Sequence, residues 1–166
     1  MRLTDASGII WGYSFQTNPL CQGCYLPLTS VAIDNEIKVV VSSDSWVSGT
    51  TWHIIKAGCL PVSDQPYFYI VDDNNNYLAV TFGGVQIFRA TPENEANRKW
   101  VFEEAGTVTD FVPGLNNTNK RAIYIYNLLV APSLRLDVQY LTDFPNLRIQ
   151  WALKNPNSKS QKFIVF

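Results

Sequence analysis

Apolar and polar residues alternate with a period of two over most of the chain, which is the pattern of half-buried β-strands. A representative stretch is the aromatic and β-branched run 67–71, which ends in residues 72–76, a run of turn formers. A second run, 77–82, then reaches the glycine pair 83–84, which is typical of a hairpin turn. No segment keeps the period of an amphipathic helix for three turns, so the chain is predicted to be all-β.

The strand pattern recurs along the chain. The aromatic anchors stand 13 or 14 residues after an apolar strand position, in the pairs Val39 and Trp52, Ile87 and Trp100, and Ile149 and Phe163. This spacing divides the chain into repeats at approximately 1–58, 59–106 and 107–166, each with four short strands. A four-strand unit cannot bury both of its faces, so the repeats must share one core, and closure protects their edges. Twelve strands in three pseudo-symmetric repeats predict a single β-trefoil domain over residues 1–166.

Composition and charge narrow the class of protein. With 166 residues, 46% hydrophobic and 13% aromatic, the chain is suited to one folded domain and is unlike a disordered segment. A net charge of −1 without a long basic cluster argues against nucleic-acid partners. The chain holds no apolar run long enough to span a membrane, and its start has no apolar leader region. We therefore expect a cytoplasmic protein, with a secreted chain that has lost its leader as the alternative.

The third repeat carries the residues from which a function can be argued. Gln161 stands two residues before Phe163, and Trp151 stands twelve residues before it. Asp137 lies between two apolar residues on the second strand of the same repeat. These features resemble the ricin-B-type lectin family, whose hallmark is a Gln-x-Trp motif on the anchor strand of each repeat, in the manner of fungal intracellular lectins with eroded motifs. The triplets that end in Trp52 and Trp100 keep the Trp and lack the Gln.

By this resemblance, the protein is a non-catalytic, carbohydrate-binding lectin whose partners are glycans or glycoproteins. The family's sugar-binding carboxylate corresponds to Asp137 and its stacking aromatic to Trp151. An ionised carboxylate accepts hydrogen bonds from two sugar hydroxyls, and an aromatic face covers the apolar C–H patch of a sugar ring. The candidate carbohydrate-binding residues are Asp137, Trp151, Ser160, Gln161, Tyr140 and Arg135.

Each leading candidate also has a structural interpretation. Asp137 can be a solvent-facing position of an alternating strand, and Trp151 can be part of the core by strand parity. Gln161 can bridge backbone groups instead of contacting a ligand. In the second repeat, the equivalent positions leave at most a degenerate pocket near Phe88 and Asn97.

A protease inhibitor is the alternative function, because fungal β-trefoil inhibitors share this architecture and fold does not decide function. Such an inhibitor presents one exposed loop, and the candidate loops are residues 107–120 and 59–66. Residues 111–115 carry apolar side chains that a solvated linker does not need. A structural or adaptor β-trefoil without a ligand is a third possibility, and the aromatic content is compatible with a homodimer.

Cysteine and histidine residues give weaker indications. Cys21, Cys24 and Cys59 with His53 include zinc-ligand types, but their spacing is not that of a zinc knuckle, so no metal or cofactor is predicted. A Cys21–Cys24 or a Cys24–Cys59 disulfide in a secreted protein and free buried thiols remain open. His53 is the single histidine, so a Ser-His-Asp or Cys-His site would have to use it, and no nucleophile-elbow motif accompanies it. We therefore predict a non-enzyme.

Overall fold

The computed structural model describes residues 6–17, 22–33, 36–42, 49–81, 84–89, 96–115, 119–139 and 146–166. This part of the chain is all-β, as predicted, and its only helices are the short 3-10 turns η2 (Ala96–Arg98) and η3 (Lys159–Gln161). The strands are β1 (Ala6–Gly8), β2 (Ile10–Thr17), β3 (Gln22–Ile33), β4 (Glu36–Ser42), β5 (Trp52–Cys59), β6 (Pro66–Val71), β7 (Asn76–Thr81), β8 (Gly84–Arg89), β9 (Trp100–Val108), β10 (Lys120–Asn127), β11 (Leu134–Val138), β12 (Asn146–Leu153) and β13 (Ile164–Val165). Over these same residues, no helix is long and apolar enough to cross a membrane.

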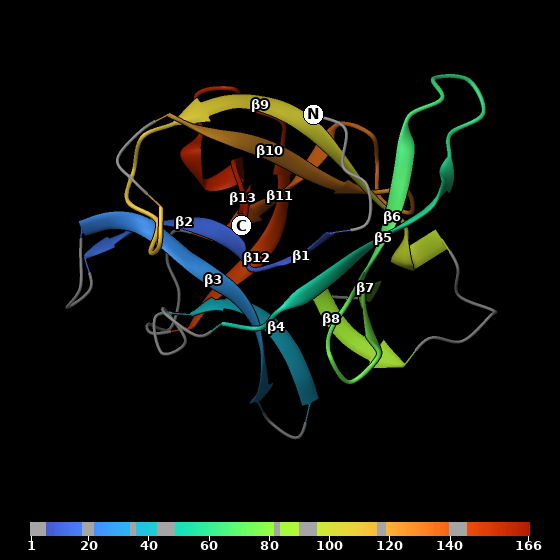
Figure 1. Cartoon of the computed structure of the whole chain (residues 1–166), viewed down its shortest axis with the longest axis horizontal. Coiled ribbons are helices and arrows are strands. Elements are labelled where there is room, and N and C mark those ends of the chain that lie inside the picture. Colours follow the sequence, from blue (N-terminus) through green and yellow to red (C-terminus); the bar gives the residue numbers. More distant parts are fainter. Residues whose placement is uncertain are drawn as a thin grey trace.

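Antiparallel pairings connect the strands into a strongly curled sheet (Figure 1). β1 pairs with β5, β5 with β6, β6 with β9, and β9 with β10. An isolated bridge then joins Ile123 of β10 to Phe163, and β13, which follows at once, pairs with β2. The last residue completes this connection, because Ile9 and Phe166 exchange two backbone hydrogen bonds, at 2.8 and 2.9 Å. The pairings therefore lead from the first strand through the molecule and back to the second.

Three further hairpins extend from this path. They are β3–β4, β7–β8 and β11–β12, and each joins two strands that are consecutive in the chain. β4 also pairs with β8, through Lys38 and Gln86, and with β12, through Arg148 and Val40 among others. The three hairpins thus meet one another at their second strands.

The main core contains apolar side chains from all three hairpins together with the three aromatic anchors of the sequence pattern. Trp52, Trp100 and Phe163 are completely buried. The indole N–H of Trp52 donates to the carbonyl oxygen of Leu28 at 3.0 Å, and that of Trp100 donates to Leu78 at 2.9 Å. Each bond satisfies a polar atom that burial removes from water, so the large apolar rings are buried without an unpaired donor.

Candidate functional site

The register of the β11–β12 hairpin decides which face each candidate residue occupies. Asp137 lies opposite Gln150, and Leu136 lies opposite Trp151. Successive strand residues point to opposite faces of a sheet, so Asp137 and Gln150 share one face, and Leu136 and Trp151 share the other. Leu136 is fully buried in the main core, which identifies the face of Trp151 as the core side.

The carboxylate of Asp137 is held by side chains from two other segments. Its Oδ2 accepts a hydrogen bond of 2.8 Å from Nε2 of Gln150 on β12, and its Oδ1 accepts one from the hydroxyl of Ser160 in η3. The Ser160 hydroxyl also lies 2.8 Å from that of Ser158. Asp137 and Ser160 are buried, while Gln150 is exposed. The structure therefore brings together two of the predicted residues, Asp137 and Ser160, with one that the sequence analysis missed, Gln150.

Gln161 bridges backbone groups, as the structural interpretation of this residue predicts. Its Nε2 donates to the carbonyl oxygen of Leu153 at 2.8 Å, and its Oε1 accepts from the backbone N–H of Asn155 at 2.9 Å. The side chain is buried by these contacts. The side-chain amide of Gln161 thus holds the segment between β12 and η3 in place through hydrogen bonds to its backbone.

Trp151 lies apart from the carboxylate. Its ring stacks on that of Trp100, with centroids 6.2 Å apart and planes 14° apart, and it packs against the main core. Since Asp137 is on the opposite face of the hairpin, the structure does not place an aromatic platform at Trp151 beside that carboxylate.

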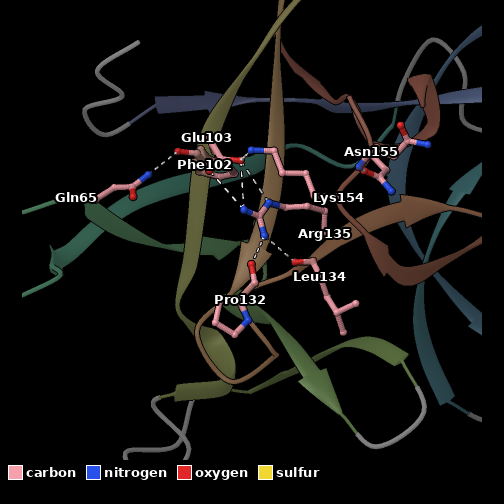
Figure 2. Close-up of polar contacts among 9 residues, drawn as sticks. Gln65, Phe102, Glu103, Pro132, Leu134, Arg135, Lys154 and Asn155 are labelled. Atoms are coloured by element: carbon pink, nitrogen blue, oxygen red, sulfur yellow. Dashed lines mark hydrogen bonds and ion pairs between the residues drawn. The ribbon is translucent and has the colours of Figure 1, made fainter. Parts of the chain in front are cut away.

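Arg135 is the buried member of an ion cluster with Glu103, which is half-buried, and Lys154, which is exposed (Figure 2). Its guanidinium lies 3.3 Å from Oε1 of Glu103, donates to the carbonyl oxygens of Pro132 and Leu134 at 2.6 and 3.0 Å, and lies over the ring of Tyr126. Lys154 Nζ approaches the same carboxylate at 2.8 Å.

The cations Arg135 and Lys154 determine the pKa of the Glu103 carboxyl. Burial raises the pKa of the Glu103 carboxyl, but the hydrogen bond from Lys154 and the charge of Arg135 outweigh it and hold that pKa below its ordinary value. Arg135 thus contacts Glu103 of β9, Tyr126 of β10 and two carbonyl oxygens at the start of β11, while Lys154, directly after β12, contacts the same carboxylate.

Other candidate positions are only partly described. Tyr140 and the side chain of Phe88 lie outside the described residues. Asn97 donates from Nδ2 to the carbonyl oxygen of Val80 at 3.4 Å, and its Oδ1 is buried with no hydrogen-bond partner among the residues that the structure describes.

The structure describes the bonding state of two of the three cysteines. Cys24 is disulfide-bonded, whereas Cys59 is an exposed free thiol. The Cys24–Cys59 pairing is therefore wrong, and so is the free-thiol interpretation of Cys24; Cys21 lies outside the described residues. Within the described ranges, no group of three or more His, Cys, Asp or Glu side chains is positioned to hold a metal ion.

The loop 59–66 is a compact turn with an apolar tip. Backbone hydrogen bonds join Leu60 to Gln65 at 2.8 Å and Asp64 to Leu60 at 2.9 Å. Asp64 adopts the left-handed region at φ 57°, and Nε2 of Gln65 donates to the carbonyl oxygen of Phe102. At the tip, the side chain of Val62 is 100% exposed. A loop that is tied at its base therefore presents the apolar side chain of Val62, next to the exposed Pro61, to solvent.

The loop 107–120 uses its apolar residues differently. Val112 is fully buried in a second apolar cluster that includes Tyr13 and Tyr25, and Leu115 packs against the same cluster. The carbonyl oxygen of Phe111 accepts a hydrogen bond from the backbone N–H of Tyr25 at 3.1 Å. Packing thus accounts for most of the apolar character of residues 111–115, and residues 116–118 lie outside the described part.

A cavity of about 200 Å³ lies between β6, β9 and β10. Its lining residues are Gln65, Pro66, Phe68, Phe102, Glu103, Glu104 and Ile123. Gln65 directly precedes β6, and the other residues lie on β6, β9 and β10, so no local motif indicates the cavity.

No protein-family model and no curated protein matches the chain. The function is therefore argued from the geometry of its own residues.

Proposed function

We propose that the chain is a single β-trefoil domain of three four-strand repeats, approximately 1–58, 59–106 and 107–166, in which β1 and β2 count as one strand interrupted at Ile9. Two observations support this fold. The pairings lead round the molecule from β1 to β2, and the hairpins of the three repeats meet through β4, β8 and β12. The indole bonds of Trp52 and Trp100 also reach equivalent strands in the first and second repeats, while the third repeat has Phe163, which carries no N–H.

Within this fold, we propose that the protein is a carbohydrate-binding lectin with a site centred on Asp137. The convergence of Gln150 and Ser160 on this carboxylate carries the proposal. Two donors fix its orientation, and a carboxylate has about four lone-pair positions, so it retains acceptor capacity. Because Asp137 is only 7% exposed, a sugar hydroxyl would have to approach this carboxylate at the rim, beside the exposed Gln150. The exposed amide of Gln150 supplies a further donor and acceptor at the rim.

The placement of Trp151 limits the expected affinity. An aromatic face that covers the C–H patch of a sugar supplies much of the contact in a shallow site, and Trp151 lies on the other side of the hairpin. Hydrogen bonds to exposed hydroxyls largely replace hydrogen bonds to water, so their net contribution is small. We expect a dissociation constant for a single sugar on the order of 1 mM, with tighter apparent binding to clustered glycans.

A glycan array followed by titration of the purified full chain tests this proposal. Asp137→Asn should weaken binding at least tenfold, because it removes the charge that strengthens hydrogen bonds from sugar hydroxyls. Glu104→Gln removes an exposed carboxylate elsewhere and should bind as the wild type does. Thermal unfolding of each variant separates a lost site from a lost fold. Equal binding by the two variants, or no glycan bound by the wild type at high protein density, contradicts the proposal.

A protease inhibitor is the second candidate, and the exposure of Val62 favours the loop 59–66 as its contact segment. An inhibitory loop must hold one conformation before binding, which reduces the entropy lost in the complex. Inhibition assays against cysteine, serine and aspartic proteases test it. Val62→Arg should abolish any inhibition that depends on this loop, whereas Leu129→Arg, at an exposed apolar turn position elsewhere, should not. Inhibition that survives Val62→Arg excludes the loop.

A further inference from the structure

Both ring nitrogens of His53 are engaged by side chains at the surface. Nδ1 lies 2.9 Å from Oγ of Ser7, and Nε2 lies 2.6 Å from Oδ1 of Asp73. Strand pairing produces this arrangement, because Ser7 is directly opposite His53 in the β1–β5 ladder. His53 is in turn opposite Val71 of β6, two residues before Asp73. The three side chains therefore meet from three segments that are far apart in sequence.

The carboxylate determines which nitrogen of the neutral ring can act as a base. An ionised carboxylate only accepts hydrogen bonds, so Nε2 carries the hydrogen that points to Asp73. Nδ1 is then left with its lone pair directed at the hydroxyl of Ser7, which donates to it. This is the relation of nucleophile, general base and orienting group found in serine-dependent acyl transfer.

We propose that Ser7 is a reactive nucleophile, that His53 is its general base and that Asp73 is a positioning residue, so that the protein hydrolyses activated esters. Oγ of Ser7 attacks the carbonyl carbon of an aryl ester, and its proton passes to Nδ1 of His53. The bond from that carbon to the aryl oxygen breaks, and the leaving phenol takes the proton from Nδ1. Water then attacks the acyl-serine by the same route, releasing the carboxylic acid and restoring Ser7.

Exposure sets the substrate class. The side chains of His53 and Asp73 are 39% and 72% exposed, so water screens the charge of the Asp73 carboxylate and is not excluded from the reacting atoms. Acceleration therefore comes mainly from general-base assistance, which contributes about 10²- to 10⁴-fold. That range suits esters with a good leaving group, such as aryl acetates, and is too small for peptide bonds. The reaction is separate from the sugar site and departs from the sequence-based expectation of a non-enzyme.

Labelling of the purified full chain with a fluorophosphonate, located by tandem mass spectrometry, tests the inference together with hydrolysis of p-nitrophenyl acetate. Ser63 is an exposed serine in the loop 59–66 and serves as the internal control. Ser7 should be labelled at least tenfold faster than Ser63. His53→Gln should remove that advantage, and Ser7→Ala should lower ester hydrolysis to the level of the uncatalysed reaction, whereas Ser63→Ala should leave it unchanged.

Asp73 requires a separate readout because it acts through His53. Asp73→Asn should reduce Ser7 labelling severalfold, and Asp73→Glu, which keeps a carboxylate, should restore part of it. Thermal unfolding shows that each variant is folded. Equal labelling of Ser7 and Ser63, or Ser7 labelling that is unchanged in His53→Gln, overturns the proposal and leaves these bonds as cross-strand contacts only.

Discussion

The buried guanidinium of Arg135 provides a quantitative test of the third repeat. Arg135→Met keeps much of the aliphatic volume and removes the charge that faces Glu103, together with the donors to the carbonyl oxygens of Pro132 and Leu134. The side chain of Arg135 is 8% exposed and that of Glu103 is 30% exposed, so the pair is largely but not completely withdrawn from water.

The loss in free energy of unfolding depends on the contacts of Glu103 that remain after Arg135→Met. Removing one partner of a fully buried ion pair costs about 3 to 5 kcal/mol. Lys154 still contacts Glu103 at 2.8 Å, and part of that carboxylate reaches solvent, so we take about 2 kcal/mol for the lost pair. Loss of the contact with the Tyr126 ring, 4.3 Å from the guanidinium carbon, adds about 0.5 to 1 kcal/mol. The expected destabilisation is therefore about 2.5 to 3 kcal/mol.

Urea unfolding at neutral pH measures this change. With a slope of about 2 kcal/mol per molar, which is ordinary for small proteins, the midpoint should fall by roughly 1.3 to 1.5 M. Arg121→Met is the matched control, because that guanidinium is 63% exposed and lies 3.9 Å from Glu104, so its loss should cost less than about 0.5 kcal/mol.

The pH dependence of this destabilisation is a second test. The folded-state pKa of Glu103 lies below its unfolded value, so the stabilisation is present above the unfolded-state pKa and is lost as pH falls through the folded-state pKa. The difference between wild type and Arg135→Met should therefore shrink in acid. A midpoint shift no larger than that of Arg121→Met, or a difference that does not depend on pH, would refute the reasoning.

Three smaller predictions rest on other described residues. Trp100→Phe removes the indole donor to a buried carbonyl oxygen and should cost about 2 kcal/mol in urea unfolding; a cost below about 0.5 kcal/mol would show that the bond is unimportant. Val112→Ala should cost about 2 kcal/mol because it empties a fully buried site, whereas Val62→Ala at the exposed tip should cost less than about 0.5 kcal/mol, and equal costs would contradict the burial of the loop 107–120. Under native, non-reducing conditions a maleimide should modify Cys59 and not Cys24, and mass spectrometry of the labelled peptides would reveal the opposite result.

Sequence reasoning succeeded where a pattern depends on burial over many residues. The strands and the anchors Trp52, Trp100 and Phe163 were predictable because alternation and aromatic spacing reflect which positions must leave water. Contact between Asp137 and Ser160 was suggested by the resemblance, which aligned both residues with one site.

The remainder of the candidate site depends on register, which a sequence does not display. Whether Trp151 or Gln150 faces Asp137 is decided by the pairing of β11 with β12, and a shift by one residue exchanges the two faces. Strand parity did contain the relevant indication, since it allowed a core position for Trp151. The meeting of Ser7, His53 and Asp73 depends on the β1–β5 and β5–β6 ladders together, so it could not be derived from the spacing of these residues.

The two backbone hydrogen bonds between Ile9 and Phe166 have a consequence for the order of folding and for protein engineering. A ribosome delivers β2 and its neighbour β3 long before β13, so the edge of β2 that pairs with β13 stays open until synthesis reaches the C-terminal segment. Such sequence-distant contacts favour slow folding and place an aggregation-prone interval during synthesis. The same proximity should permit circular permutation, in which a short linker joins Phe166 to the start of β1 and new ends are opened at the tip of the loop 59–66. The permuted chain would be expected to fold with its former first and last strands made together.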